Sequence, residues 1–114
     1  MLDCLFCKVI NREIPGSIVY EDERVLAFND INPQAPTHVL IVPKRHVESL
    51  NELRAADDQI IGELVRRAAA IAKERGISVG GYRIVFNTNR DAGQSVWHLH
   101  LHLLGGRTMT WPPG

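Results

Sequence analysis

Three of the five histidines of this 114-residue chain stand at alternate positions, in the segment His98-Leu99-His100-Leu101-His102-Leu103-Leu104. A period of two is typical of a β-strand, so we expect the three imidazoles on one face and the intervening leucines against a core. Same-face residues of a strand lie roughly 6.5–7 Å apart, which lets one small anion touch two or three rings. Near neutral pH a histidine can serve as nucleophile, general acid, general base or metal ligand. The segment therefore predicts a reactive surface built on a strand.

The segment before these histidines is rich in glycine and short polar side chains: Asn87, Thr88, Asn89, Gly93, Gln94 and Ser95. Such a loop suits a phosphate or an oxyanion, which needs close backbone approach and several hydrogen-bond donors. Other nucleophiles compete poorly, because Ser95 lacks a G-x-S-x-G setting and the sequence has no Walker A loop. The residue types favour a nucleophilic histidine that attacks phosphorus, with a neighbouring histidine as proton donor. If its strand pairs near the last one, His38 is placed to orient a catalytic imidazole.

Cys4 and Cys7 are the only cysteines, and they form a C-x-x-C arrangement. A structural disulfide is the weaker interpretation for a chain that we expect in the cytoplasm, and no βαβ pattern supports a thioredoxin-like motif. Two interpretations stay open at this point. The cysteines are half of a zinc site completed by His46 and one histidine of the alternating segment, or they are two half-buried thiols on a short helix.

The composition is that of an ordinary globular protein, with 45% hydrophobic residues and 13 basic residues balancing 13 acidic ones. A balanced charge provides no broad positive field, so we expect neither a nucleic-acid polymer nor a membrane as partner. The sequence contains no signal-peptide pattern and no apolar run of the roughly 18–20 residues that span a bilayer. We therefore expect a cytoplasmic protein with one domain over residues 1–114.

Hydrophobic periodicity and turn residues predict the order of the elements. The predicted elements are a short helix over 4–12, strands over 18–20, 25–28 and 38–42, a long helix over 51–75, a strand over 82–86 and the histidine strand over 96–104. This order favours an α+β fold, in which an antiparallel sheet carries the long helix on one face.

The alternating histidines match the His-x-His-x-His-x-x signature of the histidine-triad (HIT) superfamily, in which x is apolar. The resemblance covers nearly the whole chain and is closest to the histidine-triad nucleotide-binding (Hint) branch. It is carried by the segments 14–15, 20–22, 27–28, 30–31, 33–38, 41–44, 81–83, 93–96, 104–107 and, most specifically, Trp111-Pro112-Pro113-Gly114. It implies a single HIT domain with a five-stranded antiparallel sheet, one long helix and a short N-terminal helix. It also implies a homodimer whose sheets join into ten strands.

The resemblance further implies an enzyme that hydrolyses the P–N bond of purine nucleoside phosphoramidates, such as adenosine monophosphate linked to an amine. His100 matches the nucleophile that forms a nucleotidyl-histidine intermediate, and His102 matches a residue that contacts the phosphate. His98 and His38 match positions that support and orient the catalytic site. No cofactor is required for this chemistry.

The residues that would bind the nucleotide follow from the same resemblance. Asp30 matches the acid that accepts both ribose hydroxyls, a task that suits its two oxygens. Asn87, Gln94 and Ser95, with the backbone at Val96, match contacts on the phosphate side. The apolar slot around the base is matched by Leu5, Phe6, Val9, Ile14, Phe28, Ile31 and Leu40.

One departure from the branch concerns Cys4 and Cys7, which the best-known Hint proteins lack. They resemble the cysteines of zinc-carrying histidine-triad relatives, in which His46 and His98 would be the other ligands of a structural zinc. Bound zinc would make His98 structural rather than catalytic. A second departure is Trp97, where the branch often has tyrosine; both are large and amphipathic.

Three other functions remain as alternatives. The chain could be a nucleotide-binding regulatory or protein-interaction module with incidental hydrolysis, a dinucleoside polyphosphate hydrolase, or a protein that stores or senses metal. The sequence leaves open the physiological leaving group, the pathway, any regulatory partner and the preference between adenine and guanine.

Overall fold

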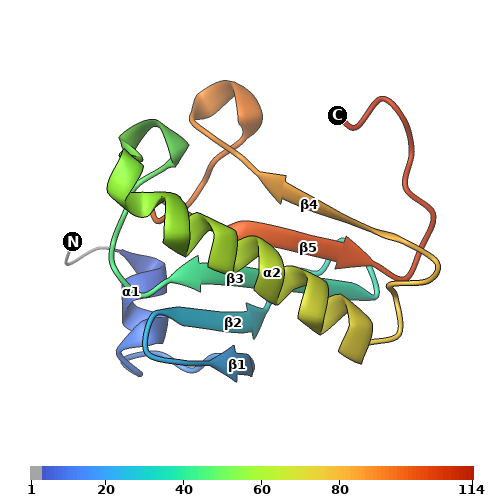
Figure 1. The fold of residues 1–114 in the computed structure, drawn as a ribbon, viewed down its shortest axis with the longest axis horizontal. Coiled ribbons are helices and arrows are strands. Elements are labelled where there is room, and N and C mark those ends of the chain that lie inside the picture. The colour runs from blue at the N-terminus through green and yellow to red at the C-terminus, as the bar shows by residue number, and fades with distance from the viewer. Residues whose placement is uncertain (1–3) are drawn as a thin grey trace.

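A five-stranded antiparallel sheet, in the order β1-β2-β3-β5-β4, forms the centre of the computed structural model, which describes residues 4–114 (Figure 1). The helix α2 crosses one face of this sheet. The helices and strands in chain order are α1 (Leu5–Ile10), β1 (Ile18–Glu21), β2 (Val25–Asn29), β3 (Thr37–Pro43), α2 (Asp58–Glu74), β4 (Tyr82–Phe86) and β5 (Leu101–Gly105). The predicted fold class, an antiparallel sheet with one long and one short helix, is confirmed. Within these residues, none of the helices is long and apolar enough to span a membrane.

The strand β5 lies between β3 and β4, so the condition under which we expect His38 to reach a histidine of the last strand is met. In the register of the β3–β5 pair, His38 lies opposite Leu104 and Leu40 lies opposite His102. His38 and His102 are therefore diagonal neighbours on one face of the sheet, a spacing that long side chains can bridge.

The two faces of the sheet carry separate apolar clusters. The α2 side buries the leucines that alternate with the histidines, Leu99, Leu101 and Leu103, against the apolar stripe of α2. The opposite side buries Phe6 and Val9 of α1 against β2 and β3. The alternating leucines thus face the main core under α2, and the chain presents its histidines away from that core, as a period of two predicts.

Two predicted elements are shorter than expected at their N-terminal ends. The long helix begins at Asp58 instead of residue 51, and two 3-10 turns, Leu50–Glu52 and Ala55–Asp57, precede it. Short polar side chains stabilise these turns by accepting backbone N–H groups, Ser49 from Asn51 and Asp57 from Arg54. Such bonds compete with the helical pattern.

The histidine strand enters the ladder only at Leu101, although the prediction began it at residue 96. Leu101 pairs with Ile41, so the same register would place Leu99 opposite Pro43, which has no N–H to donate. The segment before Leu101 leaves the sheet, and the Leu99 N–H donates instead to the carbonyl of Val47. Of the three histidines, only His102 lies on a regular strand.

Candidate functional site

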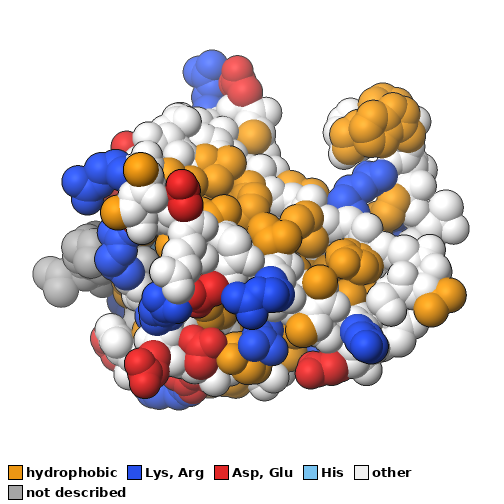
Figure 2. Space-filling model, viewed as in Figure 1, with side chains coloured by type: hydrophobic (Ala, Val, Ile, Leu, Met, Phe, Trp, Pro, Cys, Tyr) orange, Lys and Arg blue, Asp and Glu red, His pale blue; other side chains and the backbone are white. Residues whose placement is uncertain are grey.

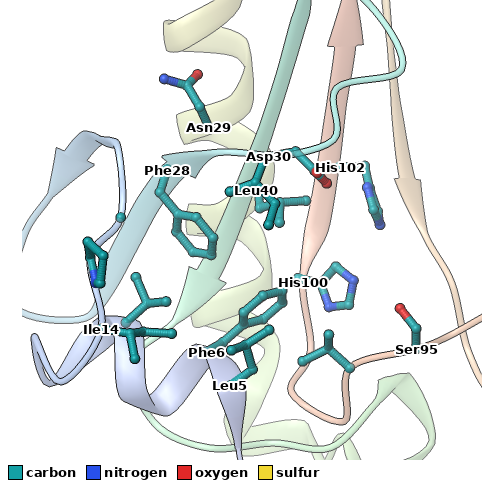
Figure 3. A pocket seen from close by; sticks show the side chains of 15 residues that line it. Leu5, Phe6, Ile14, Phe28, Asn29, Asp30, Leu40, Ser95, His100 and His102 are labelled. Atoms are coloured by element: carbon teal, nitrogen blue, oxygen red, sulfur yellow. The ribbon is translucent and has the colours of Figure 1, made fainter.

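A cavity of about 280 Å³ opens on the sheet face opposite α2. Its lining changes from apolar at one end to polar at the other, where Asp30, Ser95, His100 and His102 lie (Figure 3). The apolar part is formed by Leu5, Phe6, Val9, Ile14, Pro15, Phe28, Ile31, Leu40 and Val96. A ligand with one flat apolar part and one anionic part would match this gradient.

Aromatic rings define the apolar end of the cavity. Phe6 and Phe28 meet edge to face with their centroids 5.3 Å apart, and Phe6 also meets the His100 ring at 5.0 Å with perpendicular planes. Edge-to-face packing holds the rings in fixed orientations. The apolar slot is therefore attached directly to the histidine end of the site.

The orientation of the His100 ring is set by a backbone carbonyl. Its Nδ1 lies 2.7 Å from the carbonyl oxygen of His98, and since a carbonyl only accepts, Nδ1 carries the hydrogen. The other ring nitrogen, Nε2, then keeps its lone pair. Burial lowers the pKa of His100, which keeps the ring neutral near pH 7. A neutral ring with a free Nε2 lone pair is the form in which histidine acts as a nucleophile.

His102 belongs to a chain of hydrogen bonds that begins at the backbone of Gln34. The Gln34 N–H donates to Nδ1 of His38 (3.0 Å), so His38 carries its hydrogen on Nε2 and donates it to Nδ1 of His102 (2.9 Å). His102 is left with a hydrogen on Nε2, where it can donate to a ligand. Burial, with smaller contributions from His100 and His38, lowers the pKa of His102 to about 4. His102 is therefore a neutral donor at pH 7.

Asp30 brings negative charge to the same end of the cavity. Its Oδ2 lies 3.5 Å from Nε2 of His38, while Oδ1 accepts the backbone N–H of Asn32. Asp30, His38 and His102 each offer one atom that could bind a metal ion, and these three atoms lie close to one another. They do not fit a metal, because Nδ1 of His38 accepts an N–H and its Nε2 must carry the hydrogen that a metal would replace.

The third histidine, His98, is fully buried and does not line the cavity, so the three rings do not form one continuous surface. Its Nε2–H donates to the carbonyl of Pro43 at 2.7 Å, which leaves a lone pair on Nδ1. That nitrogen lies 3.3 Å from Cys4 Sγ, 3.5 Å from Cys7 Sγ and 3.2 Å from His46 Nδ1. Burial lowers the pKa of His98 to about 4, so the ring is neutral.

These four side chains have the chemistry and spacing of a zinc site. Tetrahedral zinc with bonds of about 2.3 Å to sulfur and about 2.05 Å to nitrogen separates ligand atoms by about 3.3–3.8 Å. Four of the six separations between ligand atoms are 3.2 to 3.5 Å, close to this geometry, and all six are within 4.8 Å. Burial and the adjacent Cys4 sulfur raise the pKa of Cys7 to about 11. A cation would oppose this shift by stabilising the thiolates.

Comparison with known proteins decides the family. The HIT domain profile matches residues 11–109. The chain belongs to the HIT, or histidine-triad, family. The two neutral rings in the cavity, His100 and His102, are thus the second and third histidines of its triad, and His98 is the first.

Relatives of known sequence and structure cover nearly the whole chain. The purine nucleoside phosphoramidase of Escherichia coli (strain K12) is 50% identical over 107 residues, which are 94% of this chain and 90% of that protein. An uncharacterized HIT-like protein of Synechococcus elongatus is also 50% identical, over 98% of this chain and 97% of its own length. The crystal structure of a HIT family hydrolase from Legionella pneumophila superposes with a TM-score of 0.97 at 53% identity, covering 98% of this chain and 100% of that one. These comparisons support a HIT-family hydrolase.

Two residues expected on the phosphate side lie outside the lining of the cavity, Asn87 and Gln94. The buried amide of Gln94 is used within the loop: its Oε1 accepts the N–H of Asn89, and its Nε2 donates to the carbonyls of Glu48 and Val96. Gln94 therefore fixes the loop that presents Ser95. Ile31 lines the rim of the cavity although its side chain is 99% exposed, which leaves it free to be covered by a ligand.

Sequence reasoning missed the backbone groups that assign the tautomers, namely the Gln34 N–H and the carbonyls of Pro43 and His98. No residue type marks such a group, because every residue except proline carries both a donor and an acceptor. A partial signal existed at Pro43, since a proline after a β-branched run predicts the end of a ladder.

Nitrogen-detected NMR of the imidazoles at pH 7 tests the assigned tautomers. We expect His100 to carry its hydrogen on Nδ1, and His38, His98 and His102 to carry theirs on Nε2. Backbone groups fix the first three rings, and the Nε2–H of His38 fixes His102. We also expect His102 to remain neutral down to about pH 5, since its pKa is about 4. A hydrogen on Nε2 of His100, or titration of His102 near pH 6.5, would contradict the assignment.

Proposed function

We propose that this protein hydrolyses the P–N bond of purine nucleoside phosphoramidates, with His100 as the nucleophile. The observation that carries the proposal is the neutral His100 ring, whose Nδ1–H is held by a carbonyl while its Nε2 lone pair is free beside an aromatic slot. The 50% identity to a purine nucleoside phosphoramidase supports the same substrate class.

Each part of such a substrate finds a matching part of the cavity. A purine base has flat aromatic faces, which suit the apolar part of the cavity lined by Phe6 and Phe28. The carboxylate of Asp30 offers acceptors for the two ribose hydroxyls. Ser95 and His102, at the polar end, offer donors for the phosphate.

The chemistry proceeds in two balanced steps. The lone pair on Nε2 of His100 forms a bond to phosphorus as the P–N bond to the amine breaks, and the amine leaves with the electron pair of that bond and takes up one proton from solvent, which the second step returns. A water molecule then attacks phosphorus, the bond to His100 breaks, and the water releases one proton. The His98 carbonyl accepts the Nδ1–H throughout, which stabilises the positive charge that the His100 ring carries as an adduct.

Replacement of the nucleophile tests this proposal. We expect His100→Gln to lower kcat for hydrolysis of an adenosine phosphoramidate by at least about a thousandfold, since loss of a nucleophile removes the covalent route. Adenosine monophosphate should still bind, because the slot and Asp30 are unchanged. Steady-state kinetics and calorimetry measure the two effects.

Undiminished hydrolysis by His100→Gln would refute the mechanism. Binding of adenosine monophosphate by wild type without turnover of any phosphoramidate would favour a binding module instead. Faster turnover of a dinucleoside polyphosphate than of the phosphoramidate would identify the other hydrolase activity.

We further propose that Cys4, Cys7, His46 and His98 bind one structural zinc ion. Elemental analysis of protein purified without a histidine tag should find one zinc per chain, and the variant Cys4→Ser/Cys7→Ser should lose it. His102→Gln is a matched control, because it removes a triad histidine outside this set and should keep its zinc. Retention of zinc by the double cysteine variant would refute the assignment.

We also propose a homodimer formed through the edge strand β4 and the adjoining side of α2. Hydrophobic side chains gather along the strip between these elements (Figure 2). Val65 of α2 is 40% exposed and Tyr82 of β4 is 39% exposed, both large for apolar residues of regular elements. A second copy pairing at β4 would extend the sheet and cover these side chains.

Light scattering should give twice the 12.8 kDa mass of the chain. The variant Val65→Glu should shift the protein toward the monomer, because it places a charge in the buried interface. Glu23→Lys, at the β1–β2 turn on the opposite edge of the sheet, should leave the mass unchanged. A monomeric wild type would contradict the proposed dimer.

A further inference from the structure

The helix α1 connects the proposed metal site to the proposed nucleotide pocket. Cys4 and Cys7 supply two of the four metal-ligand candidates, and the residues between and after them, Leu5, Phe6 and Val9, form one wall of the pocket. In Figure 3 Leu5 and Phe6 point from this helix toward His100. The short segment 4–9 therefore contributes both to the metal-ligand cluster and to the pocket lining.

This helix is too short to hold its own position. It has six residues, and isolated helices below roughly 12–15 residues are marginal in water. Contacts outside the helix must fix it. One set is apolar, in which Phe6 and Val9 pack against β2 and β3. The other set is the pair of sulfurs, which lie against His46 and His98.

A second connection runs from the metal-ligand candidates to the nucleophile. His98 contributes its ring to the cluster with the cysteines, and its carbonyl accepts the Nδ1–H of His100. The two bonds come from one residue, so the position of the His98 main chain governs the direction of the His100 ring. The cluster thus touches both the slot for the base and the attacking group.

We propose that metal binding at this cluster positions α1 and thereby sets the affinity of the pocket for nucleotide, so that metal and nucleotide strengthen each other's binding. This inference rests on the proposed nucleotide pocket. Cys4, Cys7 and His46 are then positioning residues, which act on the substrate through α1 without touching it. Linkage requires the two effects to be equal: if metal raises nucleotide affinity tenfold, nucleotide raises metal affinity tenfold.

Calorimetry with adenosine monophosphate tests the coupling without relying on turnover. We expect protein stripped of metal by a chelator to bind this nucleotide at least about tenfold more weakly than the zinc-loaded protein, and re-addition of zinc to restore the affinity. Hydrogen exchange should show α1 amides losing protection on stripping while α2 amides keep theirs. Lys8→Ala, which changes a residue of α1 outside both the cluster and the pocket lining, should retain the zinc-dependent difference.

Equal nucleotide affinity with and without zinc would overturn this inference and leave the proposed function intact. Zinc-loaded protein that binds no adenosine monophosphate would overturn the proposed function, and this inference with it. Because the metal-free protein could lose affinity by unfolding, the coupling is also measured on folded, metal-loaded protein. With cobalt(II) in place of zinc, saturation with adenosine monophosphate should change the visible spectrum of the metal, and an unchanged spectrum would contradict the coupling.

Discussion

The hydrogen bond from Nε2 of His98 to the carbonyl of Pro43 is the interaction on which the rest of the site depends. This bond is buried, and a buried carbonyl without a hydrogen-bond donor costs roughly 1–3 kcal/mol, so the tautomer of His98 with its hydrogen on Nε2 is strongly favoured. That tautomer exposes the Nδ1 lone pair to the two cysteines. It also places the His98 main chain where its carbonyl receives the His100 ring. Proline is suited to this position, because it ends the ladder with β5 and still offers an acceptor.

Burial and backbone partners give the two cavity histidines complementary roles while keeping both rings neutral. His100 donates its Nδ1–H to the His98 carbonyl and presents the Nε2 lone pair to the cavity. His102 accepts the Nε2–H of His38 at Nδ1 and presents its own Nε2–H. The two rings lie 4.9 Å apart between centroids, so a lone pair and a donor reach the same ligand. One residue type on one segment thus presents both a lone pair and a hydrogen-bond donor to the cavity. The alternating leucines Leu99, Leu101 and Leu103, packed under α2, hold this segment in place.

The sequence was sufficient for the fold class and for the separation of the two faces, because alternation in β5 and the apolar stripe of α2 are strong local patterns. It was not sufficient for the division among the three histidines. That division depends on the register of β3 against β5, which places Pro43 beside the segment that carries His98 and Leu99. Register is a long-range property, and the alternation would look the same with three equivalent rings. The place of Gln94 could not be predicted for a similar reason, since only the folded loop shows that carbonyls and an N–H already occupy its amide.

The proposed mechanism requires His100 to carry the nucleotide covalently during turnover. Acid quenching during turnover of an adenosine phosphoramidate, followed by mass spectrometry of peptides, would detect this intermediate. We expect an adduct of adenosine monophosphate on the peptide containing 98–102, located on His100 by fragmentation and absent from His100→Gln. Rapid turnover without an adduct, or an adduct on another residue, would contradict it.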